Sequence, residues 1–194
     1  VEVYFEASPR WALDQPYQQS ASKGYEADGL LYLKSGSKEQ NILAKQGDDL
    51  RIDWGYFYMV AGKENTAYSV GNSTELRKNF VNGTLNSASL EGEDSNGNMA
   101  LVRSHGKVKN VTDKIMLGYD DIYSIQYFGT NLRPYWNSKG DRTIEAEMLA
   151  AYNEYDKLLA RCYAFDKKLM EDASAAGGKE YAELCALAYR QSIA

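Results

Sequence analysis

The hydrophobic periodicity of this chain changes once, and that change constrains the fold more than any other feature. Residues 1 to about 127 alternate apolar and polar side chains, as in VEVYFE at residues 1–6, or form β-rich runs such as LRIDWGYFYMVAG at residues 50–62. From Asp141 onward the apolar spacing becomes helical. A period of two separates the faces of a strand, whereas a period near 3.6 forms one stripe along a helix. The sequence therefore predicts a β part followed by an α part.

Turn signals divide the β part into several short strands. They fall at Lys23-Gly24, Ser35-Gly36-Ser37, Gln46-Gly47-Asp48, Asn82-Gly83 and Asn96-Gly97. Pairs of this kind join antiparallel strands, and strands at this spacing predict an antiparallel β-sandwich. Between them, STELRKNF at residues 73–80 is interpreted as a short helix capped by Ser73 or Thr74.

The α part predicts two helices joined by a tight turn. Its apolar stripe consists of Met148, Tyr152, Tyr155, Leu159, Cys162 and Leu169. We expect one helix from near Asp141 to just before Gly177-Gly178, and a second from around Lys179, which together make an αα-hairpin. The predicted domains are a β-sandwich at residues 1–135, with a junction segment at 117–136, and the start of a helical-hairpin domain at 137–194.

Composition excludes several classes of function. The net charge of −5 and the pI near 5.0 argue against a nucleic-acid partner. No apolar run approaches the roughly 20 residues that span a bilayer, and the chain contains no GxGxxG or GxxxxGK[ST] phosphate loop. We expect no cofactor and no metal. Sixteen tyrosines against five phenylalanines suit an extracytoplasmic protein, secreted, periplasmic or at the cell surface, that binds polar ligands.

Both ends of the chain lie inside a pattern, VEVYFE at the start and ALAYRQSIA at the finish. We interpret the sequence as a fragment of a longer polypeptide. The two cysteines, Cys162 and Cys185, would differ in height by roughly 10 Å along the expected hairpin. That separation is too large for a disulfide, so buried free thiols are expected.

The junction segment, LGYDDIYSIQYFGTNLRPYW at Leu117 to Trp136, combines acids and aromatics at the change of secondary structure. Its adjacent carboxylates Asp120 and Asp121 are candidates for general acid/base catalysis or for binding a polar substrate or cation. On a strand the two would point to opposite faces, so only one would enter a given cleft. The alternative is a turn or helix-cap pair without chemistry.

The other junction candidates are binding residues. Tyr123, Tyr127, Phe128, Tyr135 and Trp136 either line a cleft between the two parts of the chain or simply pack there. Arg133 would clamp a substrate carboxylate in a bidentate manner or pair with an aspartate of the junction.

Two further segments contain candidate residues. Tyr189, Arg190 and Gln191 place three polar groups in one helical turn after an apolar run, which suits a cleft-facing role. His105 is the only histidine and lies beside Gly106, which favours a surface turn between strands over a catalytic base. Without a second histidine, neither a Ser-His-Asp nor a Cys-His arrangement has support elsewhere in the chain.

The junction LGYDDIYSIQYFGTNLRPYW and the helical ARCYAFDKKLMEDASAAGGKEYAELCALAYRQ, with SPRWALDQP near the start, resemble the glutaminase A family of fungi and bacteria, notably gut Bacteroidetes. The resemblance covers essentially the whole chain. It implies a β-sandwich domain followed by a domain of six helical hairpins, similar to the (α/α) toroids of several glycoside hydrolases. On that pattern, the chain holds the later part of the β domain and the first hairpin.

The resemblance implies hydrolysis of glutamine to glutamate and ammonia, with a small-molecule substrate and the rest of the polypeptide as partners. We assign the roles from chemistry and position. Asp120 or Asp121 would bind the ammonium group or activate water, Arg133 or Arg190 would hold the carboxylate, and Tyr127 and Tyr189 would orient the substrate. The junction would form one wall of an interdomain cleft. An exposed apolar helix face also predicts self-association.

Two alternatives stay open. The same architecture could cleave glycans with two carboxylates, since fold does not fix function. The β-sandwich could instead bind glycans without catalysis, or support a neighbouring domain.

Overall fold

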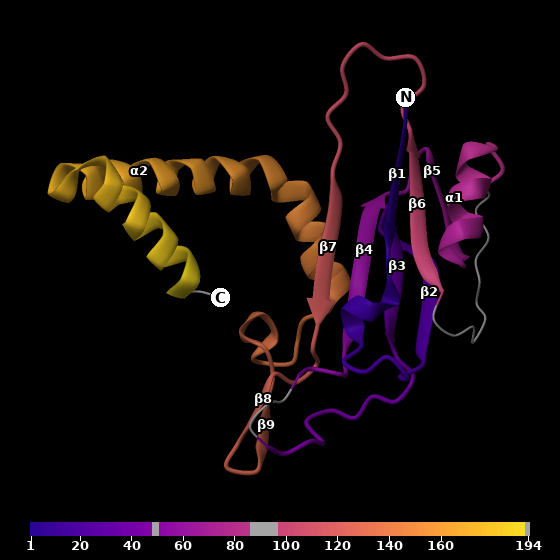
Figure 1. Ribbon diagram of the computed structural model, residues 1–194, viewed down its shortest axis with the longest axis horizontal. Coiled ribbons are helices and arrows are strands. Elements are labelled where there is room, and N and C mark those ends of the chain that lie inside the picture. The colour runs from indigo at the N-terminus through magenta and orange to yellow at the C-terminus, as the bar shows by residue number, and fades with distance from the viewer. Residues whose placement is uncertain (48–50, 86–96, 193–194) are drawn as a thin grey trace. The chain divides into compact units, whose positions relative to one another are not determined.

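The computed structural model describes residues 1–47, 51–85 and 97–192. Two antiparallel sheets form its first part (Figure 1). The three-stranded sheet has the order β1 (Glu2–Ala7), β6 (Asn98–Ser104), β5 (Thr66–Gly71). The four-stranded sheet has the order β2 (Ser20–Ala27), β3 (Leu30–Ser37), β4 (Tyr56–Gly62), β7 (Ile115–Asp120).

The two sheets share one hydrophobic core. The four-stranded sheet contributes Leu31 and Leu33 from β3 with Met59 from β4, and the three-stranded sheet contributes Met99 and Leu101 from β6. All five side chains are at most 2% exposed, and each strand supplies every second residue. The structure thus confirms the prediction from the alternation: two antiparallel sheets pack face to face.

Two of the predicted turns are wrong, because their glycines lie inside strands. A Cβ on Gly24 of β2 would lie 2.2 Å from the ring of Tyr68, which packs across from the other sheet. A Cβ on Gly36 of β3 would lie 2.5 Å from the ring of Tyr56. These glycines make room for tyrosine rings rather than for turns. The β2–β3 turn is Asp28-Gly29, with φ of 50° and 80°, as the type I′ hairpin requires.

The short helix α1 (Ser73–Val81) forms where it is predicted, but its cap differs. The Asn72 side chain accepts hydrogen bonds from the amides of Thr74 and Glu75, so Asn72 is the N-cap rather than Ser73 or Thr74. The Asn82-Gly83 signal marks the end of this helix. Asp48 and Asn96, each in a predicted turn, lie outside the described residues.

Shorter elements complete the first part. They are the 3₁₀ helices η1 (Pro9–Ala12) and η2 (Tyr135–Asn137), and the hairpin strands β8 (Ile125–Tyr127) and β9 (Thr130–Leu132). The chain divides into two compact units, residues 1–149 and 150–194.

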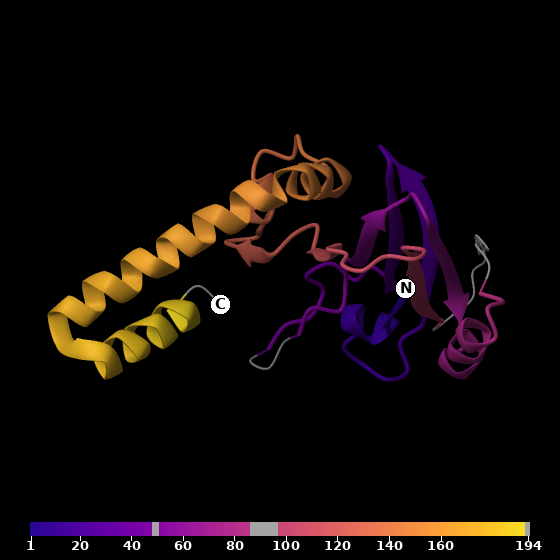
Figure 2. The same cartoon turned by 90° about the horizontal axis from the view of Figure 1, so that it is seen from above.

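The long helical segment α2 (Ile144–Ser192) follows. It starts three residues later than expected, because the hydroxyl of Thr143 accepts the amide of Ala146 and so caps its first turn. Gly178 has φ of 81° and is not helical, so the segment breaks where the sequence predicts a stop. Figure 2 shows the chain reversing direction there.

In the second unit, the two arms of α2 meet through side chains. The rings of Phe165 and Tyr189 lie 5.0 Å apart across the break, and Ala182 is fully buried. Cys162 and Cys185 are free thiols, but Cys162 is exposed and Cys185 only half-buried. The expectation of buried thiols is therefore wrong, since a single pair of arms covers little surface. No helix among the described residues is long and apolar enough to cross a membrane.

Candidate functional site

The junction begins with a strained turn at the end of β7. Asp120 is the last residue of that strand and pairs in register with Tyr56. Its carboxylate accepts the amide of Ile122 at 3.0 Å, and the amide of Tyr123 donates to the carbonyl of Asp121 at 2.5 Å. Ile122 has φ of 61°, which for a β-branched residue costs on the order of 1–3 kcal/mol. The surroundings must therefore hold this turn in place.

Trp54 is the side chain that holds it. The buried indole donates its N–H to the carbonyls of Asp121 (2.7 Å) and Tyr123 (3.0 Å), bracketing the strained residue. The hydroxyl of Tyr119 donates in turn to the carbonyl of Trp54. Burial, with nearby aspartates, raises the pKa of Tyr119 to about 12, so this donor keeps its proton. Trp54 is not among the residues predicted from sequence, although the N–H of a buried indole needs a hydrogen-bond acceptor.

Asp120 and Asp121 therefore occupy different settings. Asp120 lies on the outer face of the four-stranded sheet, and one of its carboxylate oxygens is engaged by Ile122. Asp121 lies just past the strand, where its backbone carbonyl, rather than its carboxylate, receives the indole. Gly55 packs against this segment, since a Cβ there would lie 2.4 Å from the carbonyl of Asp120.

The β8–β9 hairpin presents aromatic side chains to solvent. Its turn residues Phe128 and Gly129 have φ of 45° and 79°, as in a type I′ turn. Phe128 is 91% exposed and meets Tyr127 edge to face at 4.5 Å. Tyr135 is 97% exposed. These three side chains do not pack against the sandwich core.

Arg133 does not pair with an aspartate of the junction; its described partner is Tyr123. Its guanidinium lies 4.8 Å from the ring centroid of Tyr123, a cation–π contact. Among the described residues it forms no ion pair with a junction aspartate. Its five N–H groups are therefore not committed to a carboxylate.

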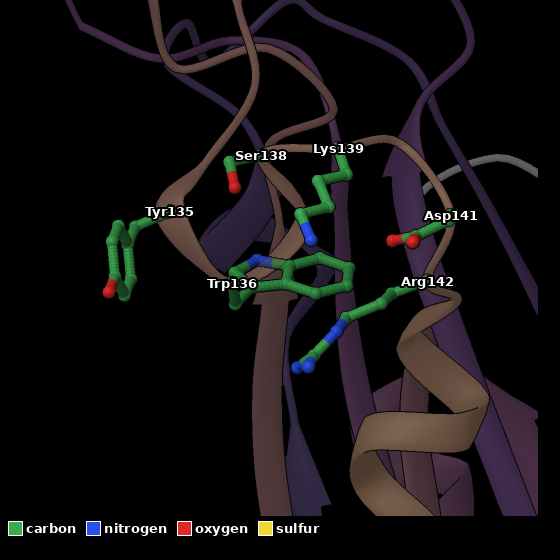
Figure 3. Close-up of a pocket in the computed structure, with 6 residues that line it drawn as sticks. All are labelled: Tyr135, Trp136, Ser138, Lys139, Asp141 and Arg142. Atoms are coloured by element: carbon green, nitrogen blue, oxygen red, sulfur yellow. The ribbon is translucent and has the colours of Figure 1, made fainter.

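A small cavity of about 280 Å³ lies between η2 and the start of α2 (Figure 3). Its lining consists of Tyr135, Trp136, Ser138, Lys139, Asp141 and Arg142. Asn137 closes this loop, because its side-chain oxygen accepts the amide of Arg142 at 3.0 Å. The guanidinium of Arg142 forms an ion pair with the carboxylate of Glu147 at 3.1 Å.

The cavity combines two cations, one carboxylate and an aromatic surface. Lys139 and Arg142 can bind a carboxylate, Asp141 can bind an ammonium group, and the indole of Trp136 can contact an aliphatic chain. This set of groups matches a small zwitterion. Of the residues proposed from sequence, only Trp136 and Tyr135 line it; Lys139, Asp141 and Arg142 were missed, because nothing in their spacing marks them as a group.

The remaining candidates lie elsewhere. Tyr189, Arg190 and Gln191 belong to the last turns of α2 in the second unit, where Tyr189 packs on Phe165. His105 follows β6, and its side chain is only 12% exposed. Its Nε2 lies 3.3 Å from Asp113, which also binds Arg103 at 2.6 Å. The described residues contain no group of three or more His, Cys, Asp or Glu side chains that could hold a metal.

The structure thus defines a class of protein: a two-sheet antiparallel β domain followed by a helical segment, with an aromatic, charged junction between them. The chain belongs to the family described as domain of unknown function DUF5127, whose model matches residues 1–172. This is the N-terminal domain found in glutaminase A-like proteins. No curated protein matches the chain, and no solved structure does.

Proposed function

We propose that this chain is part of a glutaminase A-like amidohydrolase that converts glutamine to glutamate and ammonia. The observation that supports the proposal is the family match over residues 1–172, because this domain occurs in glutaminase A-like proteins. In this proposal α2 is the first of the helical hairpins of a toroid-like domain. The other hairpins belong to the rest of the polypeptide, and the whole protein acts outside the cytoplasm.

The junction cavity supplies the binding chemistry. In our proposal Arg142 and Lys139 hold the α-carboxylate of glutamine, Asp141 receives its ammonium group, and the methylene groups lie on Trp136. Arg142 also pairs with Glu147 at 3.1 Å, so Lys139 is the cation of this cavity that has no ion pair among the described residues. The carboxamide would extend beyond the cavity, toward groups that activate water.

The junction aspartates are the proposed source of that activation. Asp120 or Asp121 would position or deprotonate the attacking water, as amide hydrolysis requires a general base. The strained turn at Ile122, held by Trp54, fixes the backbone of this pair. Tyr127, Arg133, Tyr189, Arg190 and Gln191 remain proposed contacts to substrate.

Ammonia release from glutamine by the full-length protein tests the proposal. We expect activity in the wild type, loss of at least about a hundredfold in kcat for Asp121→Asn, and a raised KM for Arg142→Gln. Arg161→Gln, an exposed arginine of α2, is the matched control and should behave as the wild type. A full-length protein that releases no ammonia from glutamine would overturn the proposal.

The chain of 194 residues is expected to be inactive by itself, since the proposal assigns further helical hairpins to the site. Measurable glutaminase activity of the purified chain would contradict this. The second unit exposes Tyr163, Leu184 and Leu187 at 55–65%, so the purified chain is also expected to self-associate. Light scattering that shows a monomer at all concentrations would count against that expectation.

Exposed aromatics support a second candidate, the binding or cleavage of glycans. Tyr127, Phe128 and Tyr135 present their rings to solvent at 61%, 91% and 97%, and exposed rings stack on sugars. Sugar release from a glycan panel, without ammonia release from glutamine, would favour a glycoside hydrolase. Glycan binding without turnover would favour a binding module.

A further inference from the structure

The outer face of the four-stranded sheet carries two lysines side by side. Lys23 of β2 and Lys34 of β3 are direct partners in the antiparallel register, and both point away from the shared core. Directly opposed residues have Cβ atoms about 5 Å apart, so like charges at such positions are destabilising. A sheet that keeps this pair needs something to offset the repulsion.

The ammonium groups of both lysines form cation–π contacts with tyrosine rings. The Nζ of Lys34 lies 3.6 Å from the ring centroid of Tyr56 and 5.4 Å from that of Tyr58, and the Nζ of Lys23 lies 5.4 Å from that of Tyr25. Tyr56 reaches this place because Gly36 has no side chain to obstruct its ring. Cation–π contacts orient the ammonium groups but leave their N–H donors without an acceptor.

The carboxylates in the neighbourhood are already engaged. Glu145 accepts the hydroxyl of Tyr25 at 2.7 Å, and Asp120 accepts the amide of Ile122 at 3.0 Å. Among the described residues neither Lys23 nor Lys34 forms an ion pair. Burial lowers the pKa of Lys34, Lys23 acts in the same direction, and Glu145 and Asp120 oppose the shift without reversing it. Neither lysine therefore has a carboxylate in direct contact among the described residues, although Glu145 and Asp120 act on Lys34 from a greater distance.

We propose that Lys23 and Lys34 bind a small oxyanion, a carboxylate or a phosphate group, on the outer face of the four-stranded sheet. Two ammonium groups from opposed positions can donate to the same oxyanion, and its charge offsets their repulsion. This site uses none of the residues that line the junction cavity, so it does not depend on the proposed glutaminase activity.

Calorimetric titration of the purified chain tests this site with inorganic phosphate and with glutamate, at constant ionic strength adjusted with chloride. We expect saturable binding of at least one of the two, weakened about tenfold or more in Lys34→Gln and in Lys23→Gln, as loss of a charge-assisted hydrogen bond predicts. The matched control is Lys63→Gln, directly after the end of β4. Lys63 already pairs with Glu26 at 2.9 Å, so its removal should leave binding unchanged.

The two ligands distinguish the source of the oxyanion. Tighter binding of glutamate indicates a carboxylic acid, and tighter binding of phosphate indicates a phosphorylated molecule; both support the site. Circular dichroism confirms that each variant keeps its sheet structure. Binding of neither ligand by the wild type, or equal affinity in the wild type, Lys34→Gln and Lys63→Gln, overturns the proposal.

Discussion

The two sheets treat charge on their outer faces in opposite ways. On the three-stranded sheet, Glu6 of β1 is surrounded by donors: Arg77 of α1 at 2.7 Å, Asn98 of β6 at 2.5 Å and the hydroxyl of Tyr4 at 3.0 Å. On the four-stranded sheet, Lys23 and Lys34 face each other with tyrosine rings but without an ion pair among the described residues.

The helix that accompanies each sheet accounts for the difference. Helix α1 brings Arg77 to the carboxylate of Glu6, and its Phe80 stacks on Tyr4 at 4.8 Å. The start of α2 brings Glu145 to the other sheet, but there it accepts the hydroxyl of Tyr25 instead of pairing with a lysine. The carboxylate of Glu6 is thus paired within the fold, whereas Lys23 and Lys34 are the cations for which we propose a ligand.

The largest expected effect comes from removing the space on which the lysine face depends. A Cβ on Gly36 would lie 2.5 Å from the ring of Tyr56 and 2.6 Å from the carbonyl of Gly55. We expect Gly36→Val to destabilise the first unit by about 3 kcal/mol, since neither the ring nor the backbone can move without further loss. Urea unfolding followed by tryptophan fluorescence measures this, because all three tryptophans lie in residues 1–149.

Ala21 provides the matched control for that substitution. It pairs directly with Gly36 in the register, on the same face, and is exposed. Ala21→Val should change the free energy of unfolding by no more than about 0.5 kcal/mol. Equal effects of the two substitutions would show that the ring of Tyr56 does not occupy the place above Gly36.

A smaller effect is expected on the matched face. Burial alone would raise the pKa of Glu6, but hydrogen bonds from Ser73, Asn98, Arg77 and Tyr4 lower it to about 2. Because the folded-state pKa lies below the ordinary value of 4.5, the ionised carboxylate stabilises the fold above about pH 4.5, and this contribution is lost as the pH falls toward 2. Allowing for solvent screening, Glu6→Gln should lose about 1–2 kcal/mol at pH 7.

Urea unfolding at pH 7, 4 and 3 checks the direction of this dependence. The difference between the wild type and Glu6→Gln should shrink steadily across that series. A difference that stays constant with pH would mean that the side chain acts through shape rather than through its charge.

The sequence predicts the fold well where periodicity is the controlling property. The alternation in β3 and β4 gives the two faces of the four-stranded sheet, and the paired glycines at Gly177-Gly178 give the break in α2. It fails at Gly24 and Gly36, which look like turns in sequence but make room for rings that arrive from distant segments. A glycine that permits close packing and a glycine that permits a turn have the same letter, and only tertiary contacts distinguish them.

The candidate site could be predicted only in part, for a related reason. The cluster of acids and aromatics marked the junction, and Trp136 does line a cavity there. Trp54, which holds the turn at Asp121, lies 67 residues away in sequence, and the partnership of Lys23 with Lys34 depends on strand register. Local sequence patterns cannot predict contacts between residues that only the pairing of distant strands brings together.

The smallest expected change in unfolding free energy is that of Lys34→Met, and its sign should be opposite to that of Glu6→Gln. Replacing Lys34 by Met keeps an apolar chain beside Tyr56 and removes the repulsion with Lys23, so in chloride buffer the variant should equal or exceed the wild type in unfolding free energy by up to about 1 kcal/mol. Because the pKa of Lys34 is lowered in the fold, wild-type stability rises as the pH approaches the ordinary lysine value of 10.5, and the advantage of the variant should fade. Urea unfolding at pH 7 and pH 10 measures both differences. Clear destabilisation by Lys34→Met in chloride would show that the cation–π contact with Tyr56 outweighs the repulsion from Lys23. The charge of Lys34 would then be stabilised within the fold without a ligand.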